Sequence, residues 1–141
     1  MTNTSSFFEL YCAFSCFNLM RIDQELMGLR PLIATKSTDN ELETFQNNVL
    51  RPIIKFQQEL WKKVAQRDPF LKKAKSTNLP ISEKWIMVMK TATKNPSLKY
   101  QWIGMITGLL TNFEFDFYYN HKKELDKRII NMLVQRIVDS D

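Results

Sequence analysis

Apolar residues recur at steps of three and four along most of the chain, which is the spacing of one buried helix face. The clearest stripe comprises Leu42, Phe45, Val49, Ile53, Phe56, Leu60 and Val64. It predicts a long second helix that begins at Thr38 or Asp39 and ends before Pro69. Pro52 lies inside the stripe, which keeps its phase on both sides of it. Because proline lacks a backbone donor and crowds the preceding turn, we expect one helix kinked at Pro52.

Capping signals delimit a first helix. Ser6 and Glu9 have the spacing of a capping box, and Gly28 can end the helix that they begin. Pro31 prevents a simple continuation, so residues 31–38 are expected to connect the first two helices.

Two further helices are predicted on either side of Asn95-Pro96, with Ser82 and Ser97 as their N-caps. The second of these carries Gly104 and Gly108 on one side. In a water-soluble protein, this spacing predicts that a neighbouring helix approaches closely.

Thr111 and Glu114 repeat the capping-box pattern and predict a short fifth helix over residues 112–119. Aromatic residues alternate over residues 113–119 as they would in a strand, but no partner strand is visible elsewhere in the sequence. A last helix then carries an apolar face made of Leu125, Ile129, Met132, Leu133 and Ile137.

The predicted fold is therefore all-α, a compact bundle of five to six helices centred on the second and the last helix. Only 3 of the 141 residues are glycine, and the frequent Leu, Lys, Glu and Gln favour helix over sheet. We divide the chain into residues 1–25, an apolar N-terminal helix or extension, and residues 26–141, a single helical-bundle domain.

Residues 7–20 are strongly apolar but lack the features of a signal peptide. No basic residue precedes them, Glu9 interrupts them, and crossing a membrane takes roughly 20 apolar residues. We therefore expect no transmembrane insertion and a cytoplasmic location. A helix that is apolar all round must be covered, so self-association or a loosely attached extension is expected. Alternatively, Met20 is the true start and residues 1–19 are not native.

Positive charge is concentrated in the middle of the chain. The net charge is +5, and residues 62–99 hold ten Lys and Arg against two acidic residues, a local charge of +8. Residues 69–81 within this segment are expected to form a loop with one helical turn over residues 70–75. The segment predicts attraction to a polyanion, or else a set of solvated helix faces. The candidate anion-binding residues are Lys62, Lys63, Arg67, Lys72, Lys73 and Lys75.

Aromatic residues lie within or beside the same segment, namely Trp61, Phe70, Trp85, Tyr100 and Trp102. Basic and aromatic residues together suit single-stranded nucleic acid, in which bases stack and phosphates pair with cations. The three tryptophans occupy or adjoin apolar helix positions, which favours core packing instead. No recognised nucleic-acid-binding signature accompanies them.

Two rows of polar residues recur at helical spacing on the second and last helices. They predict either a buried seam, with Arg51 or Arg128 opposite Glu124, or two wetted surfaces. This candidate interaction face consists of Asn47, Arg51, Lys55, Gln58, Glu124, Arg128, Asn131 and Gln135.

The sequence offers little for catalysis. His121 is the only histidine and lies near Asp116 and Glu124, a pairing that can transfer protons but is also common on surfaces. Cys12 and Cys16 are one helical turn apart without a second pair of ligands, so we interpret them as buried thiols. We predict no catalytic residue, no metal and no cofactor.

Two stretches together resemble a known family. One is Phe45-Gln46-Asn47-x-x-Leu50-Arg51-Pro52-Ile53-Ile54-Lys55-x-Gln57. The other is Gly104-Met105-Ile106-x-Gly108-x-x-Thr111-x-x-Glu114, followed by Leu125-x-Lys127-Arg128-Ile129-x-Asn131-Met132. Over residues 26–138 the chain resembles a family of small helical proteins of flavobacteria and other Bacteroidetes, some of which are named glyoxalase. That name would imply a metal held by His and Glu residues in a βαβββ module. Because the chain has one histidine and no such strand pattern, the resemblance implies a bacterial family without a mechanism.

We therefore expect a small, non-enzymatic helical protein that acts by contact with another macromolecule, either an unknown protein partner or a second copy of itself. One alternative is a nucleic-acid or polyanion binder that uses residues 62–99. Another is an enzyme, as the glyoxalase name would imply. Binding that weakens steeply with salt would identify the polyanion binder.

Overall fold

The computed structural model describes residues 21–139, and every regular element within that range is a helix. In chain order the elements are α2 (Asp23–Gly28), α3 (Glu41–Phe45), the π-helical η1 (Gln46–Leu50), α4 (Arg51–Phe56), α5 (Gln58–Arg67), α6 (Pro69–Lys75), α7 (Ile81–Lys94), α8 (Pro96–Thr107), α9 (Asn112–Asn120) and α10 (Lys122–Asp139). The all-α prediction is confirmed, but the described residues divide into more and shorter helices than the five to six expected.

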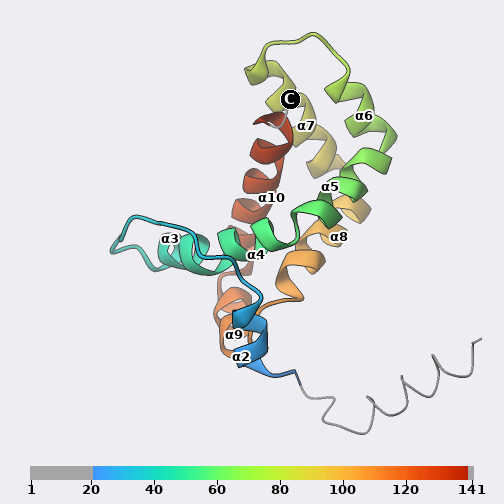
Figure 1. The fold of residues 1–141 in the computed structure, drawn as a ribbon. Coiled ribbons are helices and arrows are strands. Elements are labelled where there is room, and N and C mark those ends of the chain that lie inside the picture. Colours follow the sequence, from blue (N-terminus) through green and yellow to red (C-terminus); the bar gives the residue numbers. More distant parts are fainter. Residues whose placement is uncertain (1–20, 140–141) are drawn as a thin grey trace, which may run out of the picture.

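The long C-terminal helix α10 is the axis of the fold (Figure 1). Its buried side chains are Leu125, Asp126, Ile129, Ile130, Leu133, Val134, Ile137 and Val138. It packs most extensively against α7, and α8, α9 and η1 also contact it. The main helix pair is thus α7 with α10, rather than the predicted second helix with α10.

Figure 1 shows α6 and α7 near the end of the molecule at which α10 finishes, and α2 and α9 at the opposite end. α3 projects to one side. The last turns of α10 therefore lie close to the corner between α5 and α6, where Ile137 of α10 and Leu71 of α6 line the same groove.

The predicted second helix is a series of helical pieces rather than one long helix. α3, η1 and α4 follow one another without a break, and Pro52 lies in the first turn of α4. The wider π turn before it relieves the crowding that the proline ring would cause against the carbonyl of Asn48 in an α-helix. The break falls instead at Gln57, whose ψ is 9°, and Figure 1 shows the ribbon changing direction between α4 and α5.

These irregularities move the apolar stripe. Phe56 and Leu60, both in the predicted stripe, are 45% and 50% exposed, whereas Ile54 and Trp61 are fully buried. A π turn and a break each rotate the residues that follow around the helix axis. Steps of three and four therefore do not mark the buried face beyond Ile53.

The capping box at α9 is present as predicted. The Thr111 hydroxyl accepts a hydrogen bond from the Glu114 backbone N–H, and the Glu114 carboxylate accepts one from the Thr111 N–H. The strand alternative for residues 113–119 is wrong, because these residues are helical.

The predicted caps Ser82 and Ser97 are each two residues too late. Pro80 is the N-cap of α7, and Asn95 is the N-cap of α8, where its side chain accepts a hydrogen bond from the third residue on. Pro96 occupies the first turn of α8, where a missing N–H loses no hydrogen bond.

The first predicted helix is only partly described. α2 ends at Gly28 as expected, but it begins at Asp23 after an extended Ile22, so no helix runs unbroken from Ser6. Residues 1–20, which include Cys12 and Cys16, lie outside the described residues. The division predicted between an N-terminal extension (residues 1–25) and a helical-bundle domain (residues 26–141) falls inside α2.

The predicted close approach of a neighbouring helix at Gly104 and Gly108 is wrong. A Cβ built on Gly104 would meet no other atom within 4 Å, and one on Gly108 would meet the Gly104 carbonyl rather than a neighbouring helix. Both glycines are exposed.

Candidate anion-binding groove

A groove lies where α5, α6 and the end of α10 meet. It has a volume of about 480 Å³ and is lined by Lys62, Ala65, Gln66, Leu71, Lys72, Lys75, Ser76 and Ile137. Its apolar part comes from all three helices, whereas Lys62 and Lys72 come from α5 and α6. We call this site the basic groove.

Asp68 makes the corner between α5 and α6. Its Oδ1 accepts hydrogen bonds from the backbone N–H groups of Phe70 and Leu71, each at 3.0 Å. Pro69 then begins α6 with a φ suited to the first helical turn. The same Asp-Pro pair that ends one helix therefore starts the next.

α6 replaces much of the loop predicted for residues 69–81, where a single turn was expected. Leu71 and Ala74 anchor it in the core, while Lys72 and Lys73 are exposed. This pattern fixes the helix and leaves its charged groups at the edge of the groove.

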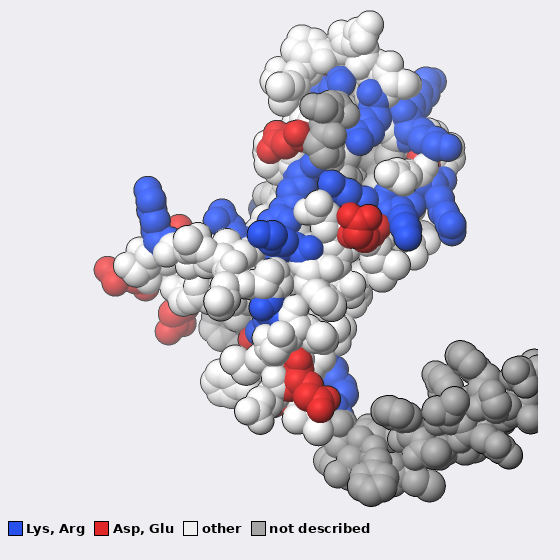
Figure 2. All heavy atoms as spheres, in the orientation of Figure 1, with Lys and Arg blue, Asp and Glu red and all other residues white. Residues whose placement is uncertain are grey.

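Two of the lysines at the basic groove, Lys62 and Lys72, have no carboxylate partner among the described residues. Lys62 instead lies over the ring of Trp61, 5.9 Å from its centroid. Figure 2 shows Lys and Arg side chains gathered over this part of the molecule, with few acidic groups among them.

Two arginines add charge beside the end of α10. Burial lowers the pKa of Arg136, and the nearby positive charge of Arg51 lowers it further. In the described part of the chain, neither guanidinium pairs with a carboxylate. An anion bound near both groups would relieve this repulsion. Sequence reasoning missed Arg136, because no spacing along the chain connects it with Arg51.

The structure brings together three of the six predicted anion-binding residues, Lys62, Lys72 and Lys75. Lys63 and Lys73 are exposed outside the lining of the basic groove. Arg67 lines a separate, smaller hollow beside the start of α8.

The predicted polar interaction face is dispersed. Asn47 is buried, Gln58 and Arg128 are half-buried, and the exposed members are Arg51, Lys55, Glu124, Asn131 and Gln135. Arg128 donates a hydrogen bond of 2.7 Å from Nη1 to Oε1 of Gln46, which joins α10 to η1. Among the described residues, no hydrogen bond or ion pair joins Arg51 or Arg128 to Glu124.

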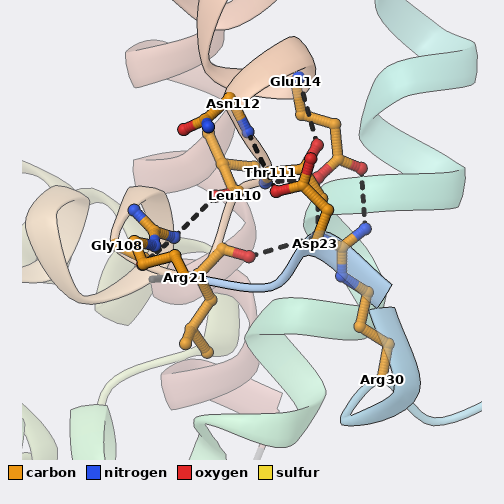
Figure 3. A network of polar contacts seen from close by, with 9 residues as sticks. Arg21, Asp23, Arg30, Gly108, Leu110, Thr111, Asn112 and Glu114 are labelled. Atoms are coloured by element: carbon orange, nitrogen blue, oxygen red, sulfur yellow. Dashed lines mark hydrogen bonds and ion pairs between the residues drawn. The ribbon is translucent and has the colours of Figure 1, made fainter. Parts of the chain in front are cut away.

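A separate polar network lies at the opposite end of the molecule (Figure 3). The Arg30 guanidinium donates to both carboxylate oxygens of Glu114, at 2.7 and 2.6 Å. Arg21 donates to the carbonyls of Gly108 and Leu110, at 2.9 and 2.7 Å. These bonds hold the beginning of the described chain against the turn between α8 and α9.

The Arg30–Glu114 pair is structural in character, since its side chains are only 10% and 13% exposed and face each other. Burial by itself would raise the pKa of Glu114, but the hydrogen bonds from Arg30 and Thr111 outweigh it and the pKa is lowered. Glu114 is thus held as a carboxylate by the fold rather than poised to transfer a proton.

A second buried cluster joins α9 to α10. The Tyr118 hydroxyl donates to Asp126, and the Asp126 carboxylate also accepts a hydrogen bond from Lys122. Burial, followed by the bond to Asp126, raises the pKa of Tyr118 to about 12. A phenol that ionises so late is a poor general base at neutral pH.

His121 does not assemble the proton-transfer pair that its sequence neighbours suggested. Its Nδ1 lies 3.0 Å from the carbonyl oxygen of Phe117, and its ring lies 4.5 Å from the Phe117 ring. Asp116 and Glu124 are both exposed, and in the described chain neither bonds to the imidazole.

Residues 21–139 contain no group of three or more His, Cys, Asp or Glu side chains arranged to hold a metal ion. Within the same range, no helix combines the length and the apolar character needed to cross a membrane. No protein-family model, curated protein or solved structure matches this chain. The chemistry of the basic groove is therefore the main basis for a functional proposal.

Proposed function

We propose that this protein is a non-enzymatic binding protein and that its partner is a polyanion held along the basic groove. The observation that carries the proposal is the position of Lys62 and Lys72, which reach one open groove from two helices without a carboxylate partner among the described residues. Cations on two sides of a groove can contact successive anionic groups of one chain.

The charge around the groove supports the same partner. Residues 62–99 carry a net charge of +8, and the guanidinium group of Arg136, in the last turn of α10, lies near that of Arg51. A partner with repeated phosphate or sulfate groups would gain from each of these cations and release its own counterions. The cytoplasmic location expected from the sequence would make nucleic acid an accessible polyanion.

Binding of a labelled mixed-sequence oligonucleotide and of heparin, measured by fluorescence anisotropy over a salt series, tests the proposal. The affinity of the parent protein should fall steeply as salt rises. Changing Lys62→Gln and Lys72→Gln together should weaken binding. It should also flatten the plot of log affinity against log salt by roughly 0.7–0.9 per lost phosphate contact.

A matched control is Lys36→Gln with Lys123→Gln, which removes the same charge at two exposed positions outside the groove lining. The control should retain most of the affinity. A parent protein that binds neither polyanion at low salt would refute the proposal, and an equal loss in both double variants would show that the groove is not the site.

Contact with another protein is a second candidate function, favoured by the aromatic surface of α9. Phe113 is 83% exposed and Tyr119 is 65% exposed. Phe113 and Phe117 also line a groove of about 460 Å³ against Phe45 of α3. Exposed aromatic residues concentrated on one helix are typical of protein interaction sites. A partner captured from native cells by the parent protein, but lost with Phe113→Ser, would support this candidate.

The enzymatic alternative finds no support among the described residues. The glyoxalase name requires several His and Glu ligands, and residues 21–139 assemble no such group. Membership of the Bacteroidetes family that the sequence resembles remains a prediction.

A further inference from the structure

A second groove lies between the start of α6 and the junction of α7 and α8. It has a volume of about 600 Å³ and is lined by Phe70, Met87, Lys90, Thr91, Lys94, Asn95 and Pro96. This volume is within the range of roughly 300–1,000 Å³ that is typical of small-molecule sites. We call it the Phe70 groove.

Phe70 is unusual for an aromatic residue in a helix that packs on the core. Its side chain is 67% exposed, although Leu71 and Ala74 of the same helix are buried. Its ring therefore adds little to the core and presents an apolar surface to the groove.

The Phe70 groove is held in shape by the residues that end and begin helices around it. Asp68, the cap of α6, accepts a hydrogen bond of 3.3 Å from the side-chain amide of Asn95, the cap of α8. This bond ties the start of α6 to the junction of α7 and α8. Phe70 on one side and Pro96 on the other are thus positioned without a ligand.

The Phe70 groove combines apolar and basic side chains. Phe70, Met87 and Pro96 supply apolar surface, while Lys90 and Lys94 are exposed one turn apart on α7. The hydroxyl of Thr91 bonds to the carbonyl of Met87 in its own helix. A flat apolar group that carries a phosphate fits this combination, because it can stack on the ring while its charge meets a lysine.

The two grooves can be occupied by one chain. Lys72 lines the basic groove, Phe70 lines the other, and Lys73 is exposed one turn after Phe70 on the same helix. A polyanion that crosses α6 would meet cations in both grooves and on α6 itself.

We propose that the polyanion is single-stranded nucleic acid, with an unpaired base stacked on Phe70 and the adjoining phosphates at Lys90 and Lys94. This inference rests on the proposed function and names its ligand class. A duplex hides the faces of its bases and cannot use the Phe70 groove, whereas a single strand can use both grooves. An aromatic ring beside cations is also compatible with an anionic membrane surface, which the experiment treats as a competing outcome.

The test compares five probes: a single-stranded oligonucleotide, the same strand with abasic sites, the corresponding duplex, heparin, and phosphatidylserine vesicles. The parent protein should bind the single strand more tightly than the abasic strand or the duplex. Phe70→Ala should weaken binding of the intact single strand roughly 5- to 150-fold, the loss expected for one stacked base. It should leave abasic-strand and heparin binding nearly unchanged.

Two further variants separate stacking from folding and from general apolar contact. Phe70→Tyr keeps an aromatic face and should retain the preference for the single strand. Phe113→Ala removes another exposed aromatic residue, on α9, and should not change the affinity for any of the probes. Circular dichroism should show that all three variants remain helical.

The outcomes distinguish this inference from the proposed function. If heparin and nucleic acid bind through the basic groove but Phe70→Ala changes nothing, only the single-strand inference is wrong. If Phe70→Ala weakens binding to phosphatidylserine vesicles but not to the intact single strand, the ligand is a membrane surface and the inference is overturned. If the parent protein binds no polyanion, both proposals fail.

Discussion

Arg30 and Glu114 show how a few side chains hold distant parts of this chain together. Arg30 lies just after α2 and Glu114 in the first turn of α9, and their bidentate contact is largely shielded from water. Glu114 also completes the cap of its own helix through the Thr111 N–H. The same carboxylate therefore serves both a local and a long-range purpose.

Replacing this carboxylate should destabilise the protein. Glu114→Gln keeps an oxygen for the cap but removes the charge that faces Arg30, and we expect a loss of roughly 2–3 kcal/mol in the free energy of unfolding. Urea denaturation at neutral pH measures this loss. Glu25→Gln, at an exposed position of α2, is the control and should change stability little.

The stabilisation by the Glu114 carboxylate should weaken as the pH falls. Because the pKa of Glu114 is lowered in the folded protein, its stabilisation is present above the ordinary value of 4.5 and is lost as the pH falls through the lower folded pKa. The difference between the parent and Glu114→Gln should therefore shrink in acid. A difference that stays constant well below pH 4.5 would contradict the ion pair as its source.

At the scale of elements, the segment from α3 to α4 combines a proline with a π turn. Phe45, just before that turn, and Leu50, its last residue, are both buried, so the core holds the register that the π turn sets. The proline is accommodated by this register rather than being its only cause.

Pro52→Ala should accordingly preserve the fold. The helical circular dichroism signal should be unchanged, and the free energy of unfolding should stay within about 1 kcal/mol of the parent value. Alanine favours the helix more than proline does, but it also gives the unfolded chain more conformational freedom, and the two effects oppose each other. Pro31→Ala, in the connection between helices, measures the unfolded-chain contribution alone. A marked loss of helical signal in Pro52→Ala would show that the proline itself maintains the π turn.

For the whole molecule, the strongly apolar residues 7–20 lead to a prediction about self-association. Residues 21–139 form a bundle whose first described residues are bound to the α8–α9 turn by Arg21 and Arg30. These anchors lie after the apolar segment in the sequence. The bundle should therefore keep its stability without that segment.

We expect the full chain to self-associate and a chain that begins at Met20 to be monomeric, with the same midpoint of urea denaturation. The physical reason is that the sequence pattern predicts a helix apolar on every face, and such a helix must be covered by protein. Size-exclusion chromatography with light scattering measures the association, and the intact mass of the natively expressed protein shows whether residues 1–19 are present. A monomeric full chain would contradict the prediction.

Local interactions explain what the sequence by itself determined. The helical class, the capping box at Thr111, the helix end at Gly28 and the stop at Asp68-Pro69 each depend on groups within about one helical turn. The sequence also determined that positive charge is concentrated in residues 62–99 and that few side chains suited to catalysis are present, because both features depend on composition alone.

Tertiary structure decided which faces of these helices meet. The π turn and the break at Gln57 rotated the stripe after Ile53, and only the packed core shows that Trp61 is buried while Leu60 is not. The basic groove needs α10 to end beside the α5–α6 corner, and the Phe70 groove needs the bond between Asp68 and Asn95. Such contacts join residues far apart along the chain, so they depend on how whole helices pack and not on any spacing within one of them.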